Sequence, residues 1–147
     1  MRAFILALLL STAACTTAAP PPAPPAPPEP AKTVSIAGSW KWEQGQESLD
    51  LALKQDGAMI TGYHSAVGQK GNKADEVAEG VGVEPSITGE LKGAVATVKF
   101  RSGYPDSTGG GTATLTLRGA FLYWQIVKSD GEHYLPKSAR LTRVKTR

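Results

Sequence analysis

The residue types that most often carry out catalysis or bind metals are sparse in this sequence. His64 and His133 are its only two histidines, and neither has a partner at the His-x-x-x-His spacing that zinc sites use. No Gly-x-Ser-x-Gly turn presents a serine nucleophile, and the glycine run at residues 109–111 lacks the strand-to-helix context of a phosphate-binding loop. We therefore expect a non-catalytic protein that holds no metal and no cofactor.

Cys15 is the one reactive side chain whose position suggests a specific chemistry. It is the only cysteine among the 147 residues, so no disulfide can form within the chain. Arg2 precedes a short apolar run that ends at Leu10, and small residues then lead into Cys15, which is the order of a secretory signal peptide. The apolar run is shorter than the roughly 20 residues that a transmembrane helix needs.

Residues 11–15, with the sequence STAAC, resemble the lipobox of bacterial lipoproteins, with Thr12 where leucine is commoner. The resemblance implies that Cys15 becomes the first residue of the mature protein and carries diacylglycerol and an N-linked acyl chain, which together anchor it in a membrane. Ordinary signal cleavage, which would give a soluble periplasmic or secreted protein, is the alternative. Because Thr16 rather than aspartate follows the cysteine, the resemblance further implies the outer membrane, with the protein facing the periplasm.

The composition divides the chain into three parts. Residues 1–14 form the expected signal peptide, residues 15–32 a lipidated, proline-rich and disordered tether, and residues 33–147 one folded domain. The prolines of the tether favour an extended polyproline II rod of roughly 40 Å, at about 3.1 Å per residue. The end of the chain is basic, with five Lys or Arg and no acid in residues 133–147. Such a terminus either lies on an anionic surface or is simply solvated, and we expect no nucleic acid partner.

From residue 35 onwards, apolar and polar side chains alternate with the period of half-buried β-strands. Leu49, Leu51 and Leu53 fall on one face, for example, and Asp56-Gly57 then favours a tight hairpin turn. We expect an all-β domain of about eight strands, a single antiparallel up-and-down meander that closes into a β-barrel and so removes its exposed edges. The expected elements are hairpins at residues 48–64, 86–101 and 112–127, a weaker strand at 77–83, a short helical turn within 72–79, and opening and closing strands at 38–43 and 133–141.

Gly38-Ser39-Trp40 begins the first expected strand, and arginines follow near the end of the last one at Arg140 and Arg143. This combination resembles the lipocalins and related calycin barrels, in which a Gly-x-Trp closes the base of the barrel and a late arginine packs across the indole. The resemblance implies a structural cation–π contact between Trp40 and one of the two arginines, worth about 0.5–2 kcal/mol.

Together with this Gly-x-Trp, the run DGAMITGYHSAVG at residues 56–68 resembles avidin and streptavidin. The resemblance implies that Tyr63 and Ser65 hydrogen-bond a ligand carbonyl, that Ser48 assists them, and that Trp124 forms an apolar wall. The sequence has one residue fewer before Tyr63 than the family, and a slip of one residue in a strand reverses the face of each side chain. The family's late ligand-binding aspartate has no match either, so we expect the fold without biotin binding.

The glycine-rich loop at residues 102–111 has Tyr104 and Pro105 as its bulky residues. Loops on rigid scaffolds often carry recognition, although a mobile hairpin connection has the same composition. We expect a non-catalytic envelope lipoprotein whose barrel or loops bind a small apolar molecule or an envelope component. An inhibitor of periplasmic proteases or lysozymes is the first alternative, since the Inh-type protease inhibitors and the lysozyme inhibitors resemble tethered barrels of this kind. A purely structural envelope protein is the second.

Overall fold

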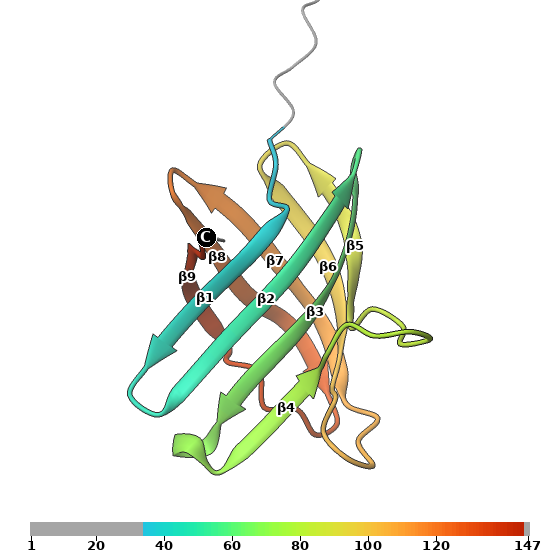
Figure 1. The fold of residues 1–147 in the computed structure, drawn as a ribbon, viewed down its shortest axis with the longest axis vertical. Helices are drawn as coiled ribbons and strands as arrows, with labels where there is room; N and C mark the ends of the chain where they lie inside the picture. Colours follow the sequence, from blue (N-terminus) through green and yellow to red (C-terminus); the bar gives the residue numbers. More distant parts are fainter. Residues whose placement is uncertain (1–33, 146–147) are drawn as a thin grey trace, which may run out of the picture. The chain divides into compact units, whose positions relative to one another are not determined.

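The computed structural model describes residues 34–145, which belong to one compact unit, Lys32–Arg147. The expected signal peptide, Cys15 and the proline-rich tether lie outside the described residues. The described part contains nine β-strands and one short 3-10 turn, and no helix in it is long and apolar enough to cross a membrane (Figure 1). The elements are β1 Gly38–Gln44, β2 Glu47–Asp56, β3 Met59–Gly68, η1 Gln69–Gly71, β4 Lys73–Val77, β5 Ile87–Lys92, β6 Val95–Arg101, β7 Gly110–Arg118, β8 Phe121–Asp130 and β9 Ser138–Arg143.

The strands form a closed antiparallel barrel and pair largely in the order of the sequence. β4 and β5 both pair with β3, β4 opposite residues 64–68 and β5 opposite residues 59–62, so the two short strands share one position in the barrel wall. β9 returns to pair with β1, and this closes a barrel of eight strand positions. The all-β, up-and-down barrel that the sequence predicts is therefore confirmed.

Inward-pointing side chains fill the interior of the barrel. Leu49, Leu51 and Leu53 of β2 point inward and are at most 4% exposed, as their spacing predicts. Trp40 of β1 and Trp124 of β8 are the largest of the fully buried side chains, each 1% exposed. Full burial of an apolar side chain contributes roughly 1.5–3 kcal/mol, so this filled interior is the main source of the stability of the fold.

One end of the barrel, which we call the turn end, is closed by tight hairpins. Its three hairpins use the same two-residue Gly-Ala turn, at Gly57-Ala58, Gly93-Ala94 and Gly119-Ala120. The three glycines have φ angles of 57°, 63° and 60°, and a positive φ at the first central residue suits a two-residue hairpin to the twist of its strands. The first described residues also enter the barrel at this end (Figure 1).

A tryptophan and an arginine pack together where the chain enters the turn end. The Arg143 guanidinium lies 4.3 Å from the centroid of the Trp40 ring and donates a hydrogen bond to the Ala37 carbonyl. Trp40 Nε1 donates to the Ile36 carbonyl at 2.8 Å. The arginine that packs across the indole is thus Arg143, whereas Arg140 lies on the outer face of β9.

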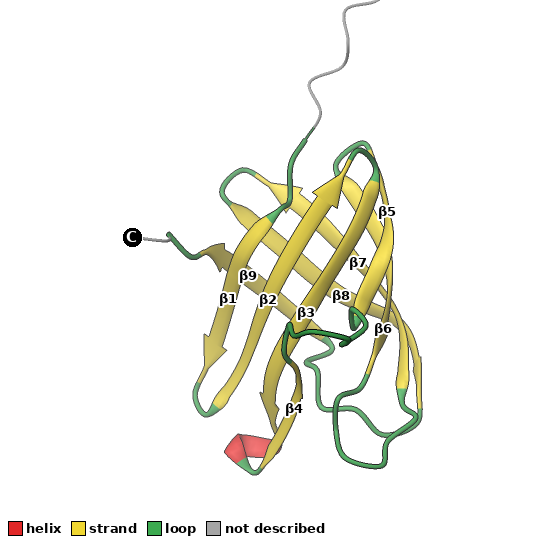
Figure 2. Cartoon of the chain, turned by 45° about the vertical axis from the view of Figure 1, so that its right-hand side comes forward, coloured by secondary structure: helices red, strands yellow, loops and turns green. Residues whose placement is uncertain are grey.

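The opposite end, which we call the loop end, carries longer connections: residues 69–72, residues 102–109 and residues 131–137 (Figure 2). Two local expectations are wrong near this end. The helical turn expected within residues 72–79 is strand β4, and the strand expected at residues 77–83 is largely a loop, because β4 ends at Val77. The central inward position of β4 holds Asp75 instead of an apolar residue, so the alternation that predicts a strand is interrupted in the sequence.

Candidate functional site

Three segments that meet at the loop end converge on one buried carboxylate. Asp75 of β4 is 0% exposed, and its oxygens accept four hydrogen bonds. The donors are Gly103 N at 2.6 Å, Ser102 Oγ at 2.9 Å, Tyr134 N at 2.9 Å and His64 Nε2 at 3.1 Å. Because these donors include residues of the β6–β7 loop and of the β8–β9 loop, the carboxylate holds both loops against the barrel.

His64 continues this network into the barrel wall. Its Nδ1 lies 2.8 Å from Ser86 Oγ, and a hydrogen on Nε2 lets the ring donate to Asp75 while it accepts from the serine hydroxyl. Carboxylate, imidazole and hydroxyl are also the groups of a hydrolase triad. Here each of the three side chains is at most 2% exposed, so no substrate reaches the Ser86 hydroxyl in this structure, and we interpret the chain of hydrogen bonds as structural.

The hydrogen bonds to Asp75 set its ionisation. Burial acts to raise the pKa of this carboxyl from 3.8, but hydrogen bonds from His64, Tyr134, Gly103 and Ser102 outweigh burial and lower the pKa to about 2. The carboxylate is therefore charged through the neutral and mildly acidic range. A buried charge is tolerated only while its donors stay in place, which couples the position of both loops to this one residue.

On the surface of the loop end, a lysine lies across a pair of tyrosines. The rings of Tyr104 and Tyr134 meet edge to face with centroids 4.8 Å apart. Lys73 Nζ lies 4.7 Å from the Tyr104 centroid and donates a hydrogen bond of 2.5 Å to the Tyr104 hydroxyl, which raises the pKa of the lysine. The Tyr134 hydroxyl donates to Glu132. The two half-buried tyrosines form the kind of rigid, amphipathic patch that binding surfaces use.

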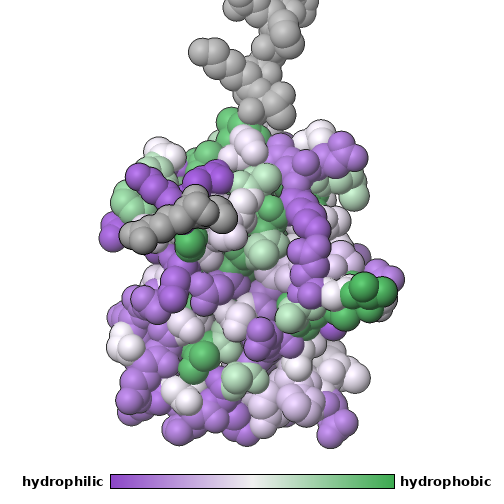
Figure 3. Space-filling view, in the orientation of Figure 1, coloured by the Kyte–Doolittle hydropathy of each residue, from purple (hydrophilic) through white to green (hydrophobic). Residues whose placement is uncertain are grey.

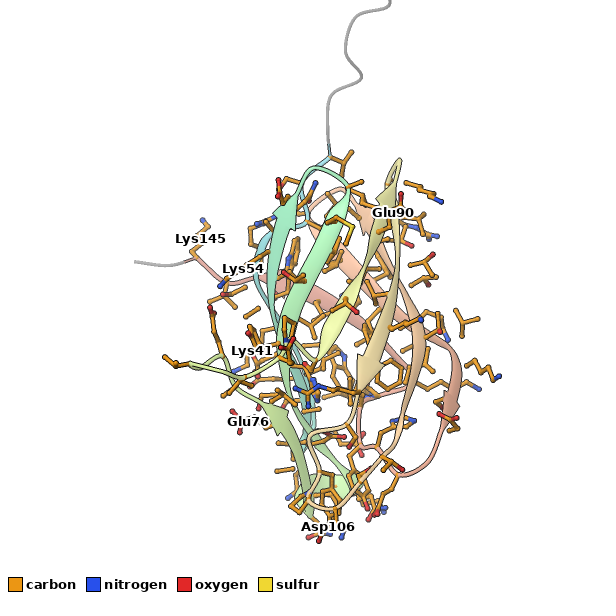
Figure 4. All side chains as sticks on the ribbon, turned by 90° about the vertical axis from the view of Figure 1, so that its right-hand side faces the viewer. Lys41, Lys54, Glu76, Glu90, Asp106 and Lys145 are labelled. Atoms are coloured by element: carbon orange, nitrogen blue, oxygen red, sulfur yellow. The ribbon has the colours of Figure 1, made fainter. Side chains whose placement is uncertain are left out.

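The β6–β7 loop is fixed by its own hydrogen bonds as well as by the buried carboxylate. Ser107 N donates to the Tyr104 carbonyl at 3.1 Å, and the Ser107 hydroxyl donates to the Glu132 carbonyl of the neighbouring loop. Of the two residues that the sequence singles out in this loop, Tyr104 is packed against the barrel and Pro105 is exposed. The exposed tip of the loop continues into Asp106, which is labelled at the loop end of the barrel, at the bottom of Figure 4.

A hollow of about 260 Å³ lies beside the tyrosine pair, between the end of β3 and the β8–β9 loop. His133 lines this hollow, and its ring packs edge to face on Phe100 with centroids 5.3 Å apart. The Nδ1 atom of His133 is buried and has no hydrogen-bond partner within residues 34–145. A buried nitrogen without a partner gains from a hydrogen bond to a bound group, so we include this hollow in the candidate site.

The structure does not gather into one pocket the four residues for which ligand binding is expected. Tyr63 and Ser65 of β3 and Ser48 of β2 point to the outside of the barrel. Trp124 points inward, and its Nε1 donates to a backbone carbonyl at 2.8 Å. In β3 the inward position belongs to His64, so its neighbours Tyr63 and Ser65 face outward.

Tyr63 and Ser65 line a separate hollow of about 330 Å³ on the outer face of β2, β3 and β4. The Tyr63 hydroxyl donates to the Val83 carbonyl at 3.0 Å, which ties the loop between β4 and β5 to the strand. This loop also exposes Val81 and Val83, and Figure 3 shows hydrophobic surface where it projects from the side of the barrel. The hollow is thus bounded by the chain's own loop.

Sequence reasoning anticipated only Tyr104 and Pro105 among the residues of the loop end. Asp75, Lys73 and Tyr134 were missed because they come from segments that are far apart in the sequence. One signal was available: an aspartate two residues before Val77 takes an inward position if the segment is a strand, and a buried aspartate needs several donors.

Comparison with protein-family models, with curated proteins and with solved structures finds no match to this chain. Within the described residues, no group of three or more His, Cys, Asp or Glu side chains is arranged to hold a metal ion. What the protein binds must therefore follow from the chemistry of its own surfaces.

Proposed function

We propose that this chain is a non-catalytic envelope lipoprotein that binds an envelope component through the loop end of its barrel. The observation that carries the proposal is the hydrogen bonding of the buried Asp75 carboxylate to both long loops. Loops that are already fixed in the free protein lose little conformational entropy on binding. The Tyr104 and Tyr134 pair is therefore preorganised for a partner.

The filled interior favours the surface over the inside of the barrel as the place of binding. Trp40, Leu115, Leu122 and Trp124 lie inside the barrel and are 0–1% exposed. An eight-stranded barrel has room either for its own side chains or for one small ligand, and the first case applies here. We therefore favour an envelope component at the loops over a small apolar molecule in the core.

The position of the loop end suits a protein attached through its N-terminus. Val34, the first described residue, precedes β1 at the turn end, and the loop end lies at the other end of the barrel (Figure 1). A lipid on Cys15 would leave the loop end free for a partner. Replacing Cys15 with serine in the full chain tests this anchor by cell fractionation. We expect the variant to leave the membrane fraction, and unchanged membrane association would contradict the anchor.

Site-specific photo-cross-linking in cells tests the binding surface. The full chain carries a photoreactive residue at Asp106 of the loop end or, as a matched control, at Ala94 of the turn end, since both positions are exposed. We expect a discrete product from the Asp106 position alone, and its loss when Tyr104 and Tyr134 are both replaced by leucine. Equal products from the two ends, or no product from either, would contradict the proposal.

Inhibition of periplasmic proteases or lysozymes is a second candidate function, and the exposed tip beside Tyr104 favours it. Inhibitory loops bind tightly because they hold their bound conformation before they meet the enzyme. Ser107 fixes the backbone behind this tip through its bonds to Tyr104 and Glu132. Purified full chain is added to periplasmic proteases and muramidases. Inhibition that Tyr104→Ala abolishes supports this function, and full activity of every enzyme excludes it.

A further inference from the structure

The outer face of β7, β8 and β9, which adjoin in Figure 1, carries three parallel rows of side chains. Residues that pair across antiparallel strands point to the same face, so each row crosses all three strands. The rows are Thr114–Gln125–Ser138, Thr116–Tyr123–Arg140 and Arg118–Phe121–Thr142. Lys41 of β1 extends the third row opposite Thr142. We call these residues the β7–β9 face.

The charge of the β7–β9 face is positive. Arg118, Arg140 and Lys41 are its charged residues, and no Asp or Glu occurs in the rows. Lys41 is paired with Glu43 of its own strand at 2.9 Å, so the two arginines carry the net charge of the face. The Arg118 guanidinium lies 5.3 Å from the Tyr123 centroid, and that of Arg140 lies 4.7 Å from the Phe121 centroid. Neither arginine forms a salt bridge in the described part of the chain. A guanidinium stacked on an aromatic ring keeps its N–H groups available to an anion.

The barrel wall is only partly paired between β1 and β9, and this seam leaves a hollow in the face. β1 pairs with β9 at only two positions, opposite Arg143 and Thr142, so β1 beyond these pairs is not joined to β9. A hollow of about 560 Å³ results, with Trp42 and Gln44 of β1 on one side and Arg140 of β9 on the other. This volume lies within the range of ligand-binding clefts, and the half-buried Trp42 adds an indole to the lining.

We propose that the β7–β9 face binds an acidic sugar chain, a saccharide that carries carboxylate or phosphate groups. The two arginines meet the acidic groups, since a guanidinium forms paired hydrogen bonds with a planar or tetrahedral oxyanion. Hydroxyl and amide side chains meet the hydroxyl groups of the sugar, and the aromatic rings meet its apolar C–H faces. The polar residues are Thr114, Thr116, Gln125 and Ser138, and the aromatic ones are Tyr123 and Trp42. This site is separate from the loop end and does not rest on the proposed function.

The combination of cationic, neutral polar and aromatic groups on the face favours a sugar chain over other ligands. An acidic peptide held by charge alone would use the arginines and leave the hydroxyl and amide rows unused. An apolar ligand would bury those rows without hydrogen-bond partners, which costs binding free energy. A sugar chain satisfies the cations, the neutral polar groups and the rings together.

Binding of the purified full-length protein to three polymers tests the proposal. Polygalacturonate is the acidic sugar chain, dextran is the neutral sugar chain, and poly-glutamate is the acidic chain without sugar. We expect polygalacturonate to bind more tightly than either of the others, with an affinity that falls as added salt screens the arginines. Equal or tighter binding of poly-glutamate would assign the face to acidic peptides and overturn the proposal, as would no binding of polygalacturonate.

Matched variants locate the site. Replacing Arg118 and Arg140 with glutamine should weaken polygalacturonate binding by roughly tenfold or more. Replacing Lys92 and Lys99 with glutamine removes the same charge from exposed outer positions of β5 and β6, and should leave the affinity unchanged. Tyr123→Ser should weaken binding of the sugar but not residual binding of poly-glutamate. Equal losses in the two double variants would overturn the proposal.

Discussion

Three hairpins at the turn end close with the same Gly-Ala pair, whereas at the loop end separate segments are held by a single buried aspartate. Each hairpin depends on two adjacent residues, because a glycine with positive φ satisfies a local requirement. The aspartate joins residues between 11 and 59 positions away in the sequence. The turn end therefore forms by local rules, while the loop end depends on closure of the whole barrel.

Asp75→Ala breaks the loop end most severely and should lower the free energy of unfolding by about 3–5 kcal/mol. The substitution leaves the buried donors of His64, Ser102 and Gly103 without their acceptor. Urea denaturation measures the loss. Asp56→Ala is the matched control at the turn end, where the exposed side chain should change stability by less than about 0.5 kcal/mol. Similar small losses in both variants would contradict the role of the network.

Alanine in place of glycine compares the two ends directly. A Cβ on Gly109 would lie 2.1 Å from the Glu132 carbonyl oxygen, so the backbone of the neighbouring loop must move, at a cost of about 3 kcal/mol. A Cβ on Gly93 meets nothing within 4 Å, and Gly93→Ala should cost only the strain of its φ of 63°, about 1 kcal/mol. Thermal unfolding measures both variants, and we expect the lower melting temperature for Gly109→Ala. A lower melting temperature for Gly93→Ala would show that the loop end accommodates the added methyl group more easily.

The pH dependence of stability isolates the charge of Asp75. Its folded pKa of about 2 lies below the ordinary value of 3.8, so the charged form stabilises the fold. This contribution is complete above about pH 4 and is lost as the pH falls towards the folded pKa. The stability advantage of the wild type over Asp75→Asn should shrink by about 2 kcal/mol between roughly pH 5 and pH 2. Unfolding by urea at each pH measures it, and a constant advantage would contradict the lowered pKa.

The turn end and the strands follow from neighbouring residues, so the sequence predicts them. Leu49, Leu51 and Leu53 alternate because every second residue of β2 faces the core. Asp75 occupies the same kind of inward position, but its polarity hides the strand and suggests a helical turn instead. Its donors cannot be identified before the barrel is closed, because three of the four lie in the loops that follow β6 and β8.

Strand register limits the prediction of binding residues in a similar way. One residue decides whether Tyr63 points into the barrel or out of it, and the structure pairs Tyr63 with Ala52 on the outer face. A resemblance in residue types carries no register by itself. The rows of the β7–β9 face have the same origin: Arg140 and Tyr123 adjoin only because β8 and β9 pair in one particular register.

Arg143→Ala tests the turn end, and its expected effect on the free energy of unfolding is small. Its guanidinium stacks on Trp40 and donates to the Ala37 carbonyl, but Arg143 is exposed, so we expect a loss of about 1 kcal/mol. Lys128→Ala, at an exposed position of β8, is the control and should have almost no effect. Urea unfolding compares both with the wild type. A loss as large as that of Asp75→Ala would mean that the turn end also depends on long-range side-chain contacts, and the contrast between the two ends would disappear.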